Sequence, residues 1–90
     1  MEKQGCRWFI AGMALRRKRQ PAQTILAENL LRMRGDAGMS QRDLATASGV
    51  RQALVSDIER GRANPTLSSL DAIADALSME VRDLFQRSED

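Results

Sequence analysis

The sequence predicts an all-α protein, a bundle of five short helices with an N-terminal extension. From Thr24 onward, apolar residues recur at the three- and four-residue spacing of a helix. No stretch alternates for long enough to form a strand, and glycine or proline interrupts the pattern at short intervals. With 90 residues, the chain is long enough for one small domain.

An N-terminal arm, residues 1–23, differs from the rest of the chain. The apolar run from Trp8 to Leu15 is followed at once by four basic residues at 16–19. This run is too short to span a bilayer, and a basic block after the run reverses the order of a signal peptide. We therefore expect no membrane association and a cytoplasmic protein.

The main domain, residues 24–87, opens with a predicted helix that starts at Thr24. Gly38 ends this helix, as a glycine after the last turn commonly does. Its apolar positions are Ile25, Leu26, Leu30, Met33 and Ala37.

A capping box predicts the start of the second helix at Gln41. Ser40 and Asp43 have the spacing at which side chain and backbone cap each other reciprocally. Gly49 ends this helix after two turns. Its apolar side is formed by Leu44, Ala45 and Ala47.

Three further helices follow, of which the last is short. The third is predicted from about Gln52 to Arg60, and Gly61 ends it. Thr66 is the expected N-cap of the fourth. Val55 and Ile58 are the inward residues of the third helix. The fourth carries the apolar residues Leu67, Leu70, Ile73, Ala74 and Leu77. A fifth helix runs roughly from Glu80 to Gln86, before a C-terminal tail at residues 88–90.

The composition excludes several classes of function. The chain has no histidine and a single cysteine, so an internal disulfide, a cysteine cluster for a metal and a Cys–His nucleophile are all ruled out. No other set of residues suggests a catalytic centre. We therefore predict a protein without enzymatic activity, metal or cofactor.

The charge is divided unevenly along the chain. Residues 1–62 carry 12 Lys or Arg and 6 Asp or Glu, a net charge of +6; residues 63–90 carry 2 and 6, a net charge of −4. The two parts sum to the +2 of the whole chain. Arginine, which binds phosphate and guanine bidentately, supplies most of the positive charge. The first two thirds therefore favour a polyanion partner, although a solvated surface gives the same counts.

The segment from Gln41 to Arg60 has the pattern of a helix-turn-helix. A small residue, Ala45, lies where the two helices approach most closely, and Gly49 follows where a tight turn requires positive φ. Val55 and Ile58 are the inward aliphatic residues of the second helix. This pattern places the second helix on the outside, where it can enter a major groove.

Over about Ile25 to Phe85, the chain resembles the Xre-type helix-turn-helix domains, the family of the lambda repressor and Cro. The matching stretches, in order, are Gly38-Met39-Ser40-Gln41, Leu44-Ala45, Gly49-Val50, Ile58-Glu59-Arg60-Gly61, Asn64-Pro65-Thr66-Leu67 and Leu84-Phe85. The resemblance implies a five-helix lambda-repressor-like DNA-binding bundle.

The resemblance also assigns roles on the third helix. Gln52 matches a position that often reads adenine, which suits an amide that both donates and accepts. Ala53 and Asp57 match base-facing positions, and Ser56 shares their face. For Ala53 and Ser56, an equal alternative to base reading is that their small side chains only permit the helix to approach DNA closely. Three roles remain open for Asp57: it accepts a hydrogen bond from cytosine N4, it acts mainly by disfavouring other DNA sequences, or it forms an ion pair with Arg60.

Phosphate contacts are implied on either side of this helix. Gln41 matches a residue that binds a phosphate and braces the recognition helix. Arg60, Arg62 and Asn64 match a phosphate-gripping loop. Arg51 departs from the family, because Ser or Thr usually caps the helix there, and we expect Arg51 to reach DNA instead. An ordinary solvated surface is the alternative for each of these residues.

Arg34 and Glu59 match a buried ion pair that joins the first helix to the third in relatives. Its role here is expected to be structural, because it sets the recognition helix against the scaffold. A solvent-exposed arginine is the alternative for Arg34.

The leading functional prediction is a sequence-specific regulator of transcription that binds a palindromic DNA operator as a homodimer. Apolar residues near the chain end are the expected dimer interface: Met79, Val81, Leu84 and Phe85. The alternative is an antitoxin or other interaction module that binds a toxin or another protein. The basic run at 16–19 is a DNA-wrapping arm, a solubilising tail, or part of an extension that has no function, with Met13 as the real start. Trp8–Ile10 packs on the domain or meets a partner.

Overall fold

The computed structural model describes residues 21–87, and all regular structure in this range is helical. The elements are α2 (Ala22–Asp36), α3 (Gln41–Ser48), α4 (Gln52–Glu59), α5 (Leu67–Ala76) and a 3-10 helix, η1 (Val81–Phe85). The prediction of an all-α fold is therefore confirmed. None of these helices is long and apolar enough to cross a membrane.

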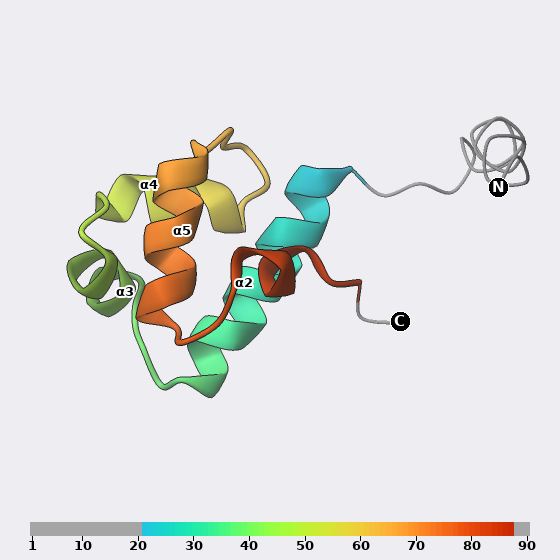
Figure 1. Ribbon diagram of the computed structural model, residues 1–90. Helices are drawn as coiled ribbons and strands as arrows, with labels where there is room; N and C mark the ends of the chain where they lie inside the picture. Colours follow the sequence, from blue (N-terminus) through green and yellow to red (C-terminus); the bar gives the residue numbers. More distant parts are fainter. Residues whose placement is uncertain (1–20, 88–90) are drawn as a thin grey trace, which may run out of the picture.

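The helices cross one another around one shared core rather than running parallel (Figure 1). α2 packs against α4 and η1, and α3 packs against α4 and α5. The largest fully buried side chains come from every element: Leu30, Leu44, Val55, Ile58, Ile73 and Leu84. Each such side chain contributes about 1.5–3 kcal/mol on burial, so every element contributes to the stability of the bundle.

The start and end of α3 follow the predicted local signals. The Ser40 hydroxyl accepts from the Asp43 N–H at 2.9 Å, and the Asp43 carboxylate accepts from the Ser40 N–H at 3.0 Å. Hydrogen bonding of the Asp43 carboxylate, first to the Ser40 backbone N–H and then to the Ser40 side chain, lowers the pKa of Asp43, because it favours the charged form. At the other end, Gly49 has φ of 80°, and its N–H donates to the Ala45 carbonyl. Both predictions are confirmed.

The start of the first helix and the placement of three apolar residues differ from what the sequence pattern suggested. α2 begins at Ala22, two residues before Thr24, because Pro21 occupies the N-cap and its carbonyl accepts from the first turn. Ala37 caps the end of α2 and is exposed, as is Ala47 on the outer side of α3. Leu67, the first residue of α5 and one of its apolar residues, is 78% exposed. The predicted arm, apart from its last three residues, and the tail lie outside the described residues.

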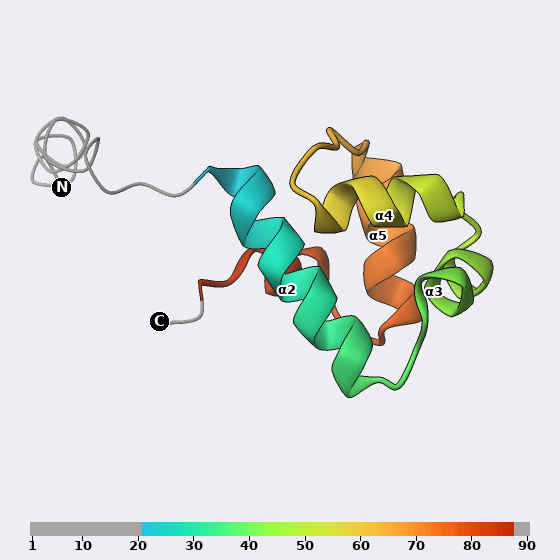
Figure 2. The same ribbon diagram turned by 180° about the vertical axis from the view of Figure 1, so that it is seen from behind.

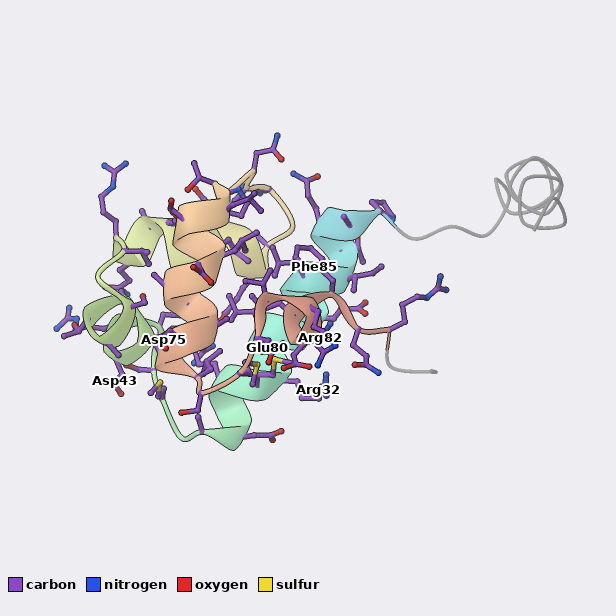
Figure 3. All side chains as sticks on the ribbon, in the orientation of Figure 1. Arg32, Asp43, Asp75, Glu80, Arg82 and Phe85 are labelled. Atoms are coloured by element: carbon purple, nitrogen blue, oxygen red, sulfur yellow. The ribbon has the colours of Figure 1, made fainter. Side chains whose placement is uncertain are left out.

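The fifth helix is a 3-10 helix whose carbonyls are held by α2. The Asn29 amide nitrogen donates to the Leu84 carbonyl at 2.8 Å and to the Gln86 carbonyl at 2.7 Å. Asn29 is itself only 3% exposed, and its amide oxygen accepts from the Arg32 guanidinium. Figure 3 shows Arg32 on the same side of the molecule as Arg82 of η1. We call these contacts the Asn29 clamp.

The clamp and the core correct one predicted interface residue. Leu84 is 0% exposed and belongs to the core cluster, so it does not face a partner chain. Met79, Val81 and Phe85 also pack against the core but keep part of their surface exposed. The apolar residues of this segment cover the inner faces of α2 and α5. Leu84 is buried completely in doing so, whereas the other three residues are buried only in part.

Candidate nucleic-acid interface

α3 and α4 form a helix-turn-helix whose inner faces are buried against each other and the core. Leu44 and Ala45 of α3 are buried, as are Val55 and Ile58 of α4. The small side chain of Ala45 allows the close approach that the sequence predicts. From behind, α4 lies in front of α5 and no other element covers it (Figure 2).

The outer side of α4 presents the residues that were predicted to read bases. Gln52, Ala53 and Asp57 are exposed, and Ser56 is half-buried. Their positions, one turn apart in pairs, place them on one face of the helix. Neither of the two salt bridges among the described residues, Arg34–Glu59 and Arg82–Glu80, includes Asp57. Asp57 therefore forms no ion pair with Arg60 in this structure.

The N-terminus of α4 lacks a side-chain cap. Arg51 is the N-cap residue, in extended conformation, and its exposed side chain makes no capping hydrogen bond. The first turn of α4 contains no acidic residue either. Its leading N–H groups therefore have no side-chain cap, and the positive end of its dipole favours a negatively charged group nearby.

A bidentate ion pair fixes the other end of α4. The Arg34 Nε donates to Glu59 Oε2 at 2.6 Å, and Arg34 Nη2 donates to Glu59 Oε1 at 3.0 Å. The side chains are 16% and 6% exposed. Arg34 also donates to the Met39 carbonyl at 2.8 Å. The expected link between the first and third predicted helices is thus present, between α2 and α4.

Gln41 joins this pair and extends it to α3. Its amide nitrogen donates to Glu59 Oε1 at 2.9 Å. Burial raises the pKa of Glu59, but the hydrogen bonds from Arg34 and Gln41 and the charge on Arg34 outweigh burial, so the pKa is lowered overall. The hydrogen bond to Glu59 raises the pKa of Arg34. Three helices therefore meet at one ionised carboxylate.

The loop between α4 and α5 carries the remaining predicted residues. Arg60, Arg62 and Asn64 are all exposed. The Arg62 N–H donates to the Asp57 carbonyl at 2.9 Å, which turns the chain away from the end of α4. Gln23, in the first turn of α2, donates from its side chain to the Ala63 carbonyl at 2.8 Å.

Two polar residues with evident structural roles were not found from the sequence. Asn29 interrupts the apolar stripe of α2 at a core position, and that interruption was an available signal. Gln23 lies only two residues after Pro21, and nothing in the local sequence indicates its contact with a loop 40 positions away. Within residues 21–87, no group of three His, Cys, Asp or Glu is placed to hold a metal ion.

The short helices, the glycine turn and the exposed second helix define a helix-turn-helix protein. The profile of the helix-turn-helix family matches residues 30–84. The chain therefore belongs to this family, and the resemblance to its Xre-type branch is confirmed.

Relatives with this sequence pattern are named as regulators or control proteins. The HTH-type transcriptional regulator DdrOP3 of Deinococcus deserti is 36% identical over 61 residues, which cover 68% of this chain and 47% of that protein. The chain thus spans about half the length of this relative. The control protein C.SmaI of Serratia marcescens is 40% identical over 63 residues, which cover 70% of this chain and 75% of that protein.

Solved structures show the same fold. The hypothetical transcription factor NHTF from Neisseria superposes with a TM-score of 0.74 at 33% identity, over 78% of this chain and 80% of that one. The restriction-modification controller protein C.AhdI from Aeromonas hydrophila gives a TM-score of 0.68 at 35% identity, over 70% of this chain and 96% of that one.

Proposed function

We propose that this protein is a sequence-specific DNA-binding regulator of transcription that places α4 in the major groove. The observation that carries the proposal is the two-sided character of α4. Val55 and Ile58 anchor its inner face in the core, whereas its outer face holds exposed polar and small side chains. A regulator of this kind acts where the DNA is, in the cytoplasm of a bacterial cell.

The exposed side chains of α4 match the chemistry of base edges. The Gln52 amide nitrogen can donate to adenine N7 while its amide oxygen accepts from the adenine N6 amino group, the bidentate contact that glutamine favours. The Ala53 methyl can contact a thymine methyl, and the Asp57 carboxylate can accept from cytosine N4. Ser56 is compatible with any base.

Positive groups surround this face on both sides. Arg51 precedes α4 and Arg60 and Arg62 follow it, and all three are exposed. The Gln41 amide nitrogen carries two hydrogens, and one is bound to Glu59, so the second remains free for a phosphate oxygen. Asn64 adds a neutral donor in the same loop. These groups fit contacts that position the protein on the duplex rather than read its sequence.

Two substitutions separate base reading from phosphate binding. Gln52→Ala is expected to cost about 1–3 kcal/mol on the selected operator and to relax preference at one base position. Arg62→Ala is expected to weaken binding to all sequences alike and to lower the slope of log affinity against log salt by about one. Fluorescence anisotropy with the operator and with single-base variants, across a salt series, measures both effects.

Arg82→Ala is the matched control for the loss of charge. Arg82 is exposed and pairs with Glu80, on η1, which packs against α2 and α5, so its removal is expected to leave the salt slope unchanged. An affinity that does not change with salt, or equal affinity for random DNA at physiological salt, contradicts the proposal.

The proposal includes a homodimer on a palindromic operator. α4 is 8 residues long, so a single copy reaches only a few base pairs, and two-fold pairing doubles the readout. A symmetric pair places its recognition helices about 34 Å apart, one helical turn of DNA. The exposed parts of Met79, Val81 and Phe85 are the proposed interface, without Leu84.

Charge placed at this interface tests the dimer. Val81→Lys is expected to shift the protein from dimer to monomer in sedimentation at micromolar concentration and to keep its helical circular dichroism. Leu67→Lys is the control, because Leu67 lies at the opposite end of α5 and is 78% exposed. If Leu67→Lys dissociates the dimer and Val81→Lys does not, the interface lies on α5 instead.

A protein-binding module, such as an antitoxin, was the alternative function. Its support is the apolar segment Trp8–Ile10, which lies outside the described residues. The exposed α4 face and its flanking arginines favour DNA, so the regulator is the proposal that we carry forward.

A further inference from the structure

The loop between α4 and α5 has few internal constraints on the part that follows Arg62. The Gly61 and Arg62 N–H groups donate back to the carbonyls of α4, and the next backbone hydrogen bond belongs to the first turn of α5. Among the described residues, the one hydrogen bond made between Ala63 and Pro65 is that from Gln23. Both neighbours of Ala63 in the chain, Arg62 and Asn64, are exposed side chains.

Gln23 reaches this loop from a distant part of the chain. Its side-chain nitrogen donates to the Ala63 carbonyl at 2.8 Å, across 40 positions of sequence, and the contact is partly buried. The first turn of α2 and the loop lie side by side in both views (Figures 1 and 2). The Ala63 side chain packs against the core, so its carbonyl and its side chain are both held.

We infer that Gln23 is a positioning residue for DNA binding, which fixes the phosphate-gripping loop without touching DNA itself. This inference rests on the proposed function. The Ala63 carbonyl belongs to the peptide group that joins Ala63 to Asn64, so its fixed direction limits the backbone rotation on both sides. Arg62 and Asn64 are then presented toward the duplex in one arrangement, and little conformational entropy is lost when phosphates bind.

Gln23→Met tests the inference, because methionine has similar length and helix propensity but no donor. Loss of this hydrogen bond is expected to weaken operator binding by about three- to tenfold and to reduce the salt slope. The same loss is expected to fall below about twofold when Arg62 is already alanine, because the two residues act through one loop. Anisotropy titrations of the wild type, both single variants and the double variant give these values.

Gln86→Met is the matched control: the same substitution at an exposed glutamine beyond η1. Circular dichroism melts show whether each variant is folded at the temperature of the titration. Equal losses from Gln23→Met in the wild-type and Arg62→Ala backgrounds would show a merely structural role and overturn the inference, and so would no loss at all. A wild type that lacks salt-dependent, sequence-selective binding would instead overturn the proposed function together with it.

Discussion

Arg34→Met is expected to lower the free energy of unfolding by roughly 3–5 kcal/mol, the range for removing one partner of a buried ion pair. The reason is the carboxylate left behind. Glu59 is 6% exposed, and without the guanidinium it keeps only the Gln41 hydrogen bond. Glu59→Leu leaves the Arg34 charge uncompensated in the same way. Urea melts followed by circular dichroism measure both changes.

The double variant, Arg34→Met with Glu59→Leu, is the control for this interpretation. It removes both charges and replaces them with apolar side chains, so it is expected to lose much less stability than the sum of the single variants. If each single change costs less than about 0.5 kcal/mol, the range of surface substitutions, the pair is not a buried structural contact.

The same pair sets a dependence on pH. The folded-state pKa of Glu59 is lowered, so its contribution is complete above the unfolded pKa, which is about 4.3 for glutamate. Stability is then lost as the pH falls from there through the lower folded-state value. In the double variant, this acid loss is expected to be smaller than in the wild type.

Leu84→Ala is the second large change, with an expected loss of about 2–5 kcal/mol. Leu84 is fully buried where η1 closes the core between α2 and α5, and its removal leaves a cavity there. Domains of this size lose about 4–8 °C in Tm for each kcal/mol. Leu84→Glu is expected to unfold the domain, because an unpaired charge would replace a core side chain. Thermal melts of both variants are the measurement.

Val81→Ala provides the comparison within the same 3-10 turn. Val81 is only half-buried, so its truncation is expected to cost clearly less than that of Leu84. A Leu84→Glu variant that keeps its helix content and merely becomes monomeric would show that Leu84 faces a partner chain, in contradiction to its burial.

Local signals explain which parts of the fold could be predicted from the sequence. The capping box of Ser40 and Asp43 and the turn at Gly49 act within a few residues, so α3 and its exit were predicted closely. The direction of short apolar clusters could not be predicted this way. Leu84 points inward and Leu67 outward because of packing against distant helices, and neither the residue type nor the helical period encodes this.

The candidate site also has parts that the local sequence predicts and parts that depend on contacts between distant residues. The exposed face of α4 follows from helical periodicity once Val55 and Ile58 are placed inward. The Arg34–Glu59 pair was expected only from resemblance to a family, since nothing in the local sequence links two charges 25 positions apart. The contact of Gln23 with the Ala63 carbonyl is a side-chain-to-backbone bond, so no residue at the accepting position could have signalled it.

The Asn29 clamp has a consequence for which positions of the chain can vary. Asn29 binds main-chain oxygens of Leu84 and Gln86, and every residue type has such an oxygen. The contact therefore constrains the identity of the donor and not that of the two residues it holds. Burial in the core restricts the residue type at Leu84. The Gln86 side chain is exposed, so neither burial nor the contact with Asn29 restricts the residue type there. One side chain in α2 thus fixes the path of the chain from Leu84 to Gln86, and the side chain at position 86 can change without removing the acceptor of this contact.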